Sequence, residues 1–376
     1  MTTGGAPAVS RLPESIWREE ALARRFRVER ELGRGGQAVV VVAYHRELDE
    51  RVALKFLLPD VAQSSASIAR FRREARAAAK IKNEHVVRII DVCATESGIP
   101  YIVMEYLDGH DLEHLLRRAP KGQLAVPDAV DFVLQASEAL AEGHRLGIVH
   151  RDLKPANLFC VDRDDGFPMI KVLDFGISKI QPLPGDVERT DRYEILGSPR
   201  YMSPEQIDAS RDVDQRSDIW SLGVILYQAI AGRVPFGGEI VADLWHKIRT
   251  ATPLPLIELR EIPEALNRAV MRCLEKEPAR RFANLGEFAD ALACVAPEQS
   301  RNSIDRILRA TGTRPAALHS SIPTVTTDPT LVAGSVPTVT HNHRRRTTVV
   351  GLCVAVSALA GLTATRFILR QTPDTD

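Results

Sequence analysis

The stretch His150-Arg151-Asp152-Leu153-Lys154-Pro155-Ala156-Asn157 is the part of this chain that decides its fold. It brings a candidate base, a cation and a metal-binding amide together within a few residues. Such a string can arise by chance, so its meaning depends on its surroundings. Other segments with charged or glycine-rich patterns lie on both sides of it, in an order and at distances that fit one fold.

The composition sets broad limits on the chain. Its 376 residues are 44% apolar, enough for a large buried core. Its 49 basic and 49 acidic residues balance, so nothing indicates bulk attraction to nucleic acid. The 5 cysteines form no C-x-x-C pair, which favours a reducing compartment over a disulfide framework or a zinc site. The N-terminus shows no secretory signal pattern, and Thr2 excludes N-myristoylation.

The first third of the chain is expected to form a small antiparallel sheet with one helix. Residues 1–25 are a lead-in, partly helical over 16–25. From Phe26 the pattern predicts strand, glycine turn and strand. The further strands are predicted at 52–56, 86–93 and 99–106, and the helix at 65–82.

After residue 107 the pattern becomes mainly helical. A helix is predicted over 127–146, and a hairpin over 158–173 with Asp165-Gly166 at its turn. Residues 218–232 are apolar all round, which indicates a helix buried in a core and too short to span a membrane. Helical segments continue to about residue 295.

Three groups of residues suggest phosphate chemistry. The glycine segment Gly33-Arg34-Gly35-Gly36-Gln37-Ala38-Val39-Val40 lies between two predicted strands, where backbone N–H groups can approach an anion. An ordinary hairpin turn is the alternative. Ala38 stands where the third glycine of such a loop is expected, and a positive φ there would be strained.

Lys55 lies inside an apolar strand and therefore needs an anionic partner. Glu74 shares a helix face with Phe71 and Ala78, so its carboxylate is expected to point inward. We expect the two to pair, either to orient Lys55 for phosphates or as a plain structural ion pair. Asp174-Phe175-Gly176 follows a predicted strand at 170–173.

Taken together with residues 197–205 and Asp218-Ile219-Trp220-Ser221-Leu222-Gly223, these motifs resemble those of protein kinases, specifically the eukaryotic-like (Hanks-type) Ser/Thr kinases of bacteria. The resemblance covers residues 26–295. It implies an α+β, bilobal fold with an N-lobe at 26–107, a mainly helical C-lobe at 108–295 and ATP in the cleft.

The resemblance assigns roles to the reactive side chains. Asp152 would accept or orient the proton of the substrate hydroxyl, and Lys154 would neutralise charge on the γ-phosphate. Lys55, oriented by Glu74, would hold the α and β phosphates. Asn157 and Asp174 would bind Mg²⁺, for which Mn²⁺ could substitute. His150 is expected to be structural, as are a buried Glu205–Arg281 ion pair and Asp218, which would cap the catalytic loop.

The resemblance also implies how the nucleotide binds. Met104 would be the gatekeeper, Val40 and Ala53 would pack on the adenine, and the backbone of Glu105 and Leu107 would bond to its edge. The full set expected to bind ATP is Leu32, Gly33, Arg34, Gly35, Gly36, Gln37, Ala38, Val40, Ala53, Lys55, Met104, Glu105 and Leu107.

Substrate class and regulation follow from the same resemblance. Lys154-Pro155, and Ser198 in the place beside the catalytic Asp, favour Ser/Thr hydroxyls of proteins over Tyr. Arg151 would pair with a phosphorylated activation loop. Of the candidates Ser178, Thr190 and Ser198, Thr190 is the expected regulatory site and Ser198 a substrate-site residue.

Residues 296–346 are rich in Ser, Thr and Pro and are expected to form a juxtamembrane linker. Two similar segments, 321–326 and 335–340, carry threonines next to prolines. These could recruit phosphothreonine-binding modules, or they could be ordinary linker sequence.

Residues 347–369 are expected to be a single transmembrane helix, followed by a short tail at 370–376. Residues 347–365 carry no charge, and a helix of that length rises about 28 Å, close to one hydrocarbon core. Arg344-Arg345-Arg346 should stay cytoplasmic, which places the kinase domain in the cytoplasm at the cell membrane. A buried soluble helix is the alternative. With the transmembrane helix in place, signals would act from the cytoplasmic side or through dimerisation.

The sequence therefore predicts a membrane-anchored, ATP-dependent Ser/Thr protein kinase in signal transduction. Two alternatives stay open: a nucleotide-binding pseudokinase scaffold and a small-molecule kinase on a related fold. A scaffold usually lacks one of three residues that are all present here, Lys55, Asp152 and Asp174. The activation segment and Ser203-Pro204-Glu205 argue against a small-molecule substrate.

Overall fold

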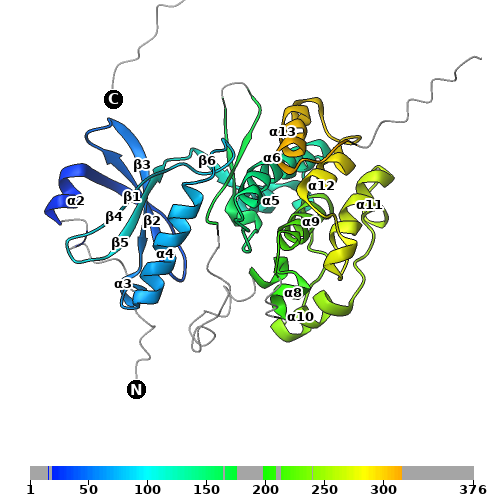
Figure 1. The fold of residues 1–376 in the computed structure, drawn as a ribbon, viewed down its shortest axis with the longest axis horizontal. Helices are drawn as coiled ribbons and strands as arrows, with labels where there is room; N and C mark the ends of the chain where they lie inside the picture. Colours follow the sequence, from blue (N-terminus) through cyan, green and yellow to red (C-terminus); the bar gives the residue numbers. More distant parts are fainter. Residues whose placement is uncertain are drawn as a thin grey trace, which may run out of the picture. The chain divides into compact units, whose positions relative to one another are not determined.

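The computed structural model describes residues 16, 19–163, 166–175, 198–208, 213–238 and 240–315. Its first part is a 5-stranded antiparallel sheet in the order β1-β2-β3-β5-β4, with α4 lying across it (Figure 1). The elements are α2 (Glu20–Arg25), β1 (Phe26–Arg34), β2 (Ala38–His45), β3 (Glu50–Leu57), α3 (Pro59–Ala62), α4 (Ser65–Ala78), β4 (Ile89–Ala94) and β5 (Pro100–Glu105).

The position of α4 follows from its amphipathic pattern. Phe71 and Ala75, one turn apart, are buried. They share an apolar cluster with Leu57 of β3 and Ile102 of β5. Glu74 lies between them in sequence and is half-buried. The helix thus carries one carboxylate at the margin of the sheet.

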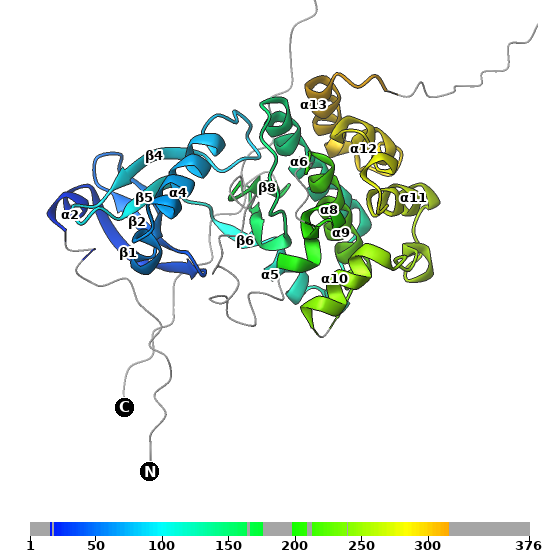
Figure 2. The same cartoon turned by 60° about the horizontal axis from the view of Figure 1, so that its bottom comes forward.

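The second part is mainly helical, with a 3-stranded antiparallel sheet in the order β6-β7-β8. Figure 2 shows α6 and α9 together in the helical part, with α12 and α13 beside them. The elements are β6 (Gly109–Asp111), α5 (Leu112–Arg118), α6 (Val126–Arg145), β7 (Leu158–Val161), β8 (Met169–Val172), α8 (Pro204–Ile207), α9 (Arg216–Ala231), α10 (Val241–Thr250), α11 (Glu264–Cys273), α12 (Leu285–Leu292) and α13 (Arg301–Thr311).

Helix α9 forms the centre of the helical core. It is buried on all sides over most of its length, as the apolar residues on every face of its sequence predict. Trp220 is fully buried, and its ring stacks on Phe236 with centroids 5.8 Å apart. The core around α9 is therefore a rigid base for the segments that carry the charged residues.

Gly223 of α9 is needed for close packing between helices. A Cβ at this position would lie 2.4 Å from the Cβ of Cys273 on α11. We expect Gly223→Ala to lower the free energy of unfolding by about 1–3 kcal/mol through overpacking. This outweighs the roughly 1 kcal/mol by which Ala is the better helix former.

Chemical denaturation of the purified protein measures this effect. Gly237→Ala is the matched control, since a Cβ at Gly237 meets no heavy atom within 4 Å. The control should stay within about 0.5 kcal/mol of the parent. An unchanged or higher midpoint for Gly223→Ala would contradict the argument from packing.

Most predicted elements are confirmed. The predicted helices at 65–82 and 218–232 correspond to α4 and α9, and the predicted hairpin at 158–173 corresponds to β7 and β8. Strand β6 was not predicted, since a strand of this length leaves little alternation in the sequence.

One boundary was wrong. The linker was expected to begin at residue 296, but α13 spans Arg301–Thr311 and buries Ile304, Ile307 and Leu308. Their i, i+3, i+4 spacing makes one apolar face, which the Ser/Thr/Pro-rich average of the longer window conceals.

The remaining C-terminal predictions fall on residues 316–376, outside the described residues. Thr190 and Ser178 are outside them as well. Over the ranges that the structure does describe, no helix combines the length and apolar character needed to cross a bilayer.

Candidate active site

Four of the residues predicted to bind nucleotide lie on one face of the first sheet. Strand register puts Val40 opposite Lys55 and Ala53 opposite Met104. Residues directly opposite in neighbouring strands share a face, as do alternate residues of one strand. Val40, Ala53, Lys55 and Met104 therefore line a single surface.

The glycine segment forms the turn between β1 and β2 at the end of this face. The Gly35 N–H donates to the Ala38 carbonyl at 2.9 Å. A Cβ at Gly33 would meet no described heavy atom within 4 Å, so the backbone there is open to a ligand. Ala38 begins β2 and is not among the described residues with positive φ. The strain expected at Ala38 therefore does not arise.

Lys55 pairs with a different carboxylate from the one predicted. Its Nζ lies 2.6 Å from Oδ1 of Asp174, and its side chain is 16% exposed. Among the ion pairs of the described residues, Lys55 is joined to Asp174 rather than to the predicted Glu74. The choice between two carboxylates near one ammonium depends on how segments far apart in the sequence meet, which the sequence pattern does not specify. The burial argument for an anionic partner nevertheless holds.

The catalytic loop brings the other predicted side chains together. Lys154 Nζ lies 3.6 Å from Oδ2 of Asp152. The side-chain amide of Asn157 donates to the Asp152 carbonyl at 2.8 Å, and the Asn157 carbonyl accepts from Leu173 N–H at 2.9 Å. Asn157 is thus hydrogen-bonded both to Asp152 and to Leu173, the residue that precedes Asp174.

His150 is structural, as predicted. It is fully buried, and its Nε2 lies 3.0 Å from the Leu173 carbonyl. Its ring also contacts Phe175, with centroids 4.9 Å apart. These contacts hold the segment around Asp174 against the loop.

Two residues of the site have strained backbone. Arg151 and Asp174 have φ values of 64° and 48°, in the left-handed region. For residues other than glycine this costs roughly 1–2 kcal/mol each. Asp218 offsets the cost of the strained backbone at Arg151. Its carboxylate accepts hydrogen bonds from the backbone N–H groups of His150 and Arg151, both at 2.9 Å. Its predicted capping role is thereby confirmed.

Asp218 makes stability depend on pH. Burial alone would raise the pKa of Asp218, but the hydrogen bond from His144 Nε2 at 2.7 Å and those from the loop bring it below the ordinary value of 3.8. A lowered folded-state pKa stabilises the protein above the unfolded pKa. That stabilisation is lost as the pH falls below 3.8 through the folded value.

We therefore expect Asp218→Asn to be less stable than the parent at neutral pH, with a difference that shrinks below about pH 4. Denaturant titrations at several pH values measure it. A difference that stays constant from neutral to acid pH would contradict the assignment.

The expected hinge contains an ion pair that the sequence analysis missed. Lys171 of β8 lies 2.8 Å from Oε1 of Glu105, and the same oxygen accepts from the Arg88 backbone N–H at 2.7 Å. Lys171 is a cation within an apolar strand, the same signal that drew attention to Lys55. The backbone contacts of Glu105 and Leu107 with adenine stay a prediction.

The Glu205–Arg281 ion pair is confirmed. Two parallel bonds of 2.8 Å join the guanidinium to the carboxylate. The Arg281 side chain is fully buried. Burial alone would raise the pKa of Glu205, but Arg281 lowers it. The pair fixes the segment that follows the activation loop onto the helical core.

The metal ligands proposed from the sequence fit a hard divalent cation. Because the Asn157 amide nitrogen faces the Asp152 carbonyl, its Oδ1 remains to accept a cation. Asp174 supplies a carboxylate whose side chain is half-exposed and which is paired, among the described residues, with the ammonium of Lys55. Amide and carboxylate oxygens are the ligands that Mg²⁺ prefers.

Comparisons with known proteins agree with this geometry. The family model described as protein kinase domain matches residues 26–293. The chain is 38% identical over 275 residues to a probable serine/threonine-protein kinase of Clostridium acetobutylicum, covering 73% of this chain and 40% of the relative. It is 39% identical over 295 residues to the serine/threonine-protein kinase Pkn1 of Myxococcus xanthus, covering 78% of this chain and 40% of that relative.

Among solved structures, the kinase domain of PknI from Mycobacterium tuberculosis is similar, with a TM-score of 0.54 and 28% identity. The match covers 72% of this chain and 96% of that domain. The chain spans about two fifths of the length of the two curated relatives.

Proposed function

Because the chain belongs to the protein kinase family, we propose that it is a serine/threonine protein kinase that transfers the γ-phosphate of ATP to protein hydroxyls. The observation that carries the proposal is the convergence of Lys55, Asp152, Asn157 and Asp174 at one site. Phosphoryl transfer needs positioning and charge neutralisation more than covalent chemistry, and these side chains supply both.

Each side chain has a distinct task. Lys55 holds the α and β phosphates once it separates from Asp174. Asp152 orients the substrate hydroxyl and takes up its proton, and Lys154, 3.6 Å from it, neutralises charge near the γ-phosphate. Asn157 and Asp174 would hold Mg²⁺, or Mn²⁺ in its place, and the metal would supply positive charge to offset that of the phosphates.

Two features favour Ser/Thr hydroxyls. The relatives at 38% and 39% identity are named serine/threonine kinases. The Lys154-Pro155 pair follows the pattern of that class. The pseudokinase alternative lacks support, because the lysine, the catalytic aspartate and the metal aspartate are all present and grouped.

Arg151 supports regulation by loop phosphorylation. Its Nη2 donates to the Val213 carbonyl at 3.2 Å, whereas its buried Nε has no hydrogen-bond partner among the described residues. A phosphate on the activation loop would satisfy this donor. Thr190 is the proposed site, and full activity of Thr190→Ala would refute that assignment.

Anchoring belongs to the proposal as well. The uncharged residues 347–365 after Arg344-Arg345-Arg346 support a single span with the kinase domain in the cytoplasm, at the cell membrane. The proposed function also includes dimerisation and the binding of phosphothreonine-recognising modules to the linker. Extraction of the full chain from membranes by carbonate, without detergent, would contradict the span.

The test is transfer of label from γ-labelled ATP in the presence of Mg²⁺. The full chain and its Asp152→Asn variant are purified in detergent and incubated in parallel, and products are mapped by mass spectrometry. Label on Ser or Thr in the parent and none in the variant supports the proposal. Absence of label in both, with nucleotide still bound, would favour the scaffold.

A further inference from the structure

Helix α13 lies beyond the part of the chain that the kinase family model covers, residues 26–293. It nevertheless packs tightly on α6 and α12. A Cβ at Gly286 of α12 would lie 2.2 Å from the hydroxyls of both Thr311 and Thr313. Only a glycine permits this approach, so the sequence of α12 is suited to the presence of α13.

Strand β8 leads directly into Asp174 and is the edge strand of its sheet. Its outer backbone groups are nevertheless satisfied. The Ile170 N–H donates to Oε1 of Gln135 at 2.7 Å, and the Ile170 carbonyl accepts from Nδ1 of His85 at 2.8 Å. Two backbone hydrogen bonds continue the contact. The Val172 N–H donates to the His85 carbonyl at 2.7 Å, and the Val87 N–H donates to the Val172 carbonyl at 3.2 Å.

The groups that cover this edge are held by residues beyond the family match. Gln135 donates to Asp131 at 2.8 Å, and Asp131 accepts from the hydroxyl of the buried Ser300. A second chain of contacts starts at Arg306 of α13. Its Nη1 donates to Glu84, next to His85, and also to Oε1 of Glu138 on α6 at 3.1 Å. Both chains end on the backbone of Ile170.

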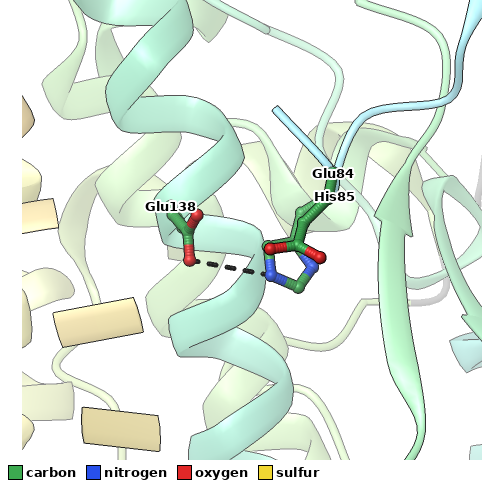
Figure 3. Close-up of side chains that lie close together, drawn as sticks. All are labelled: Glu84, His85 and Glu138. Atoms are coloured by element: carbon green, nitrogen blue, oxygen red, sulfur yellow. Dashed lines mark ion pairs between the residues drawn. The ribbon is translucent and has the colours of Figure 1, made fainter. Parts of the chain in front are cut away.

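Figure 3 shows Glu138 on α6 facing His85, with Glu84 beside it. The ligand atoms of these residues lie within 4.8 Å of one another, close enough to share one cation. In this structure the cation is the Arg306 guanidinium, which forms an ion pair with one oxygen of Glu84 and with one oxygen of Glu138. Since Nδ1 of His85 donates to Ile170, its Nε2 faces Oε2 of Glu138 at 3.6 Å.

Glu138 explains why a cation is needed. It is only 3% exposed, and its Oε2 has no hydrogen-bond partner among the described residues. Besides Arg306, its Oε1 accepts from the amide of Asn83 at 3.0 Å. A buried carboxylate without a cation is costly. Loss of Arg306 would also leave the carboxylates of Glu84 and Glu138 within 4.8 Å of each other without their shared cation, and their repulsion would loosen the loop at 83–87 from β8 against the hydrogen bond from Asn83.

We propose that Arg306 is a positioning residue for Asp174: through Glu84 and Glu138 it clamps the 83–87 loop onto the edge of β8 and so fixes the segment that carries Asp174. This inference rests on the proposed function for its effect on catalysis. Its structural part concerns the β8 edge alone and can be measured without any activity.

The test uses the full chain with Arg306→Ala, and with Arg309→Ala as the matched control. Arg309 is exposed on the same helix, and its side chain bonds to the Asp305 carbonyl within that helix. Amide hydrogen exchange is followed over 83–90 and 168–175. We expect the Val87 and Val172 amides to exchange about tenfold faster in Arg306→Ala, the effect of losing roughly one charged hydrogen bond. Exchange in α9 and in the Arg309 variant should match the parent.

Catalysis provides the second measurement. We expect Arg306→Ala to raise the KM for Mg-ATP several-fold, with partial recovery in Arg306→Lys, because a lysine keeps the charge but not the planar guanidinium whose Nη1 donates to both carboxylates. Glu84→Gln should shift both measurements in the same direction and by less, since it keeps Arg306 bound to Glu138.

Three results would overturn the proposal. The first is parental exchange at Val87 and Val172 in Arg306→Ala. The second is faster exchange spread equally over α9 and α11, which would indicate a general loss of stability. The third is altered exchange with an unchanged KM for Mg-ATP. If the parent transfers no phosphate, the proposed function fails while the exchange measurement still decides whether the clamp exists.

Discussion

The Asp174→Asn variant is expected to fold normally and to transfer phosphate about 10²–10³ times more slowly than the parent, the usual cost of removing one preorganised electrostatic contact. Asn is isosteric with Asp and tolerates the left-handed backbone found at this position, φ 48°. The change therefore removes a charge without adding strain. What is lost is the carboxylate proposed to hold the metal and now paired with Lys55 at 2.6 Å.

Initial rates measured against Mg²⁺ concentration test this expectation. The concentration of metal that gives half-maximal rate should rise in the variant. Asp162→Asn is the matched control, because Asp162 is exposed on the same hairpin at the end of β7. If Asp174→Asn kept the parental rate and metal dependence, Asp174 would not be a metal ligand.

The second large effect concerns stability. Arg281→Ala is expected to lower the free energy of unfolding by about 3–5 kcal/mol, because removing one partner strands the other charge of a buried pair. Among the described residues, Glu205 would keep the Ser217 hydroxyl at 2.6 Å and a backbone N–H, but no cation. The Glu275 carbonyl would lose the Nε–H donor that now lies 2.8 Å away.

Urea denaturation of the parent and the variant measures the difference. Arg280→Ala serves as control, since Arg280 is the exposed neighbour in the same turn. Its effect should stay within about 0.5 kcal/mol. A loss of less than about 1 kcal/mol for Arg281→Ala would mean that the pair is effectively solvated, as surface pairs are.

The sequence was most informative where a pattern is local. Period-two geometry along β3 is enough to put Ala53 and Lys55 on one face, since it depends only on neighbouring residues. Val40 joins them through the register between β2 and β3, and the sequence offered it only through the family resemblance. The apolar run in α9 likewise predicts its burial. The ordered motifs predicted that Asp152 and Asn157 of the catalytic loop would share a site with Asp174, which follows β8.

The sequence was least informative where segments distant along the chain compete. Glu74 and Asp174 are both acceptable partners for Lys55, and only the approach of α4 and of the segment after β8 decides between them. Helix α13 was missed for another reason. Its apolar face is short and is averaged with the polar sequence that follows. The contact of Arg306 with Glu84 spans 222 positions and leaves no local sign.

The Lys55–Asp174 ion pair has a consequence for the thermodynamics of ligand binding. Each of these groups neutralises the other, so a nucleotide without metal must draw Lys55 away from a carboxylate that is then left unpaired, and a metal without nucleotide must do the reverse to Asp174. When nucleotide and metal bind together, the ion pair is broken only once, and Lys55 and Asp174 each gain a new partner of opposite charge. Affinities for nucleotide and metal should therefore be coupled, and each should strengthen the other by the same factor. On the proposed function, the pair would make the site favour the complex of nucleotide and metal over either component alone.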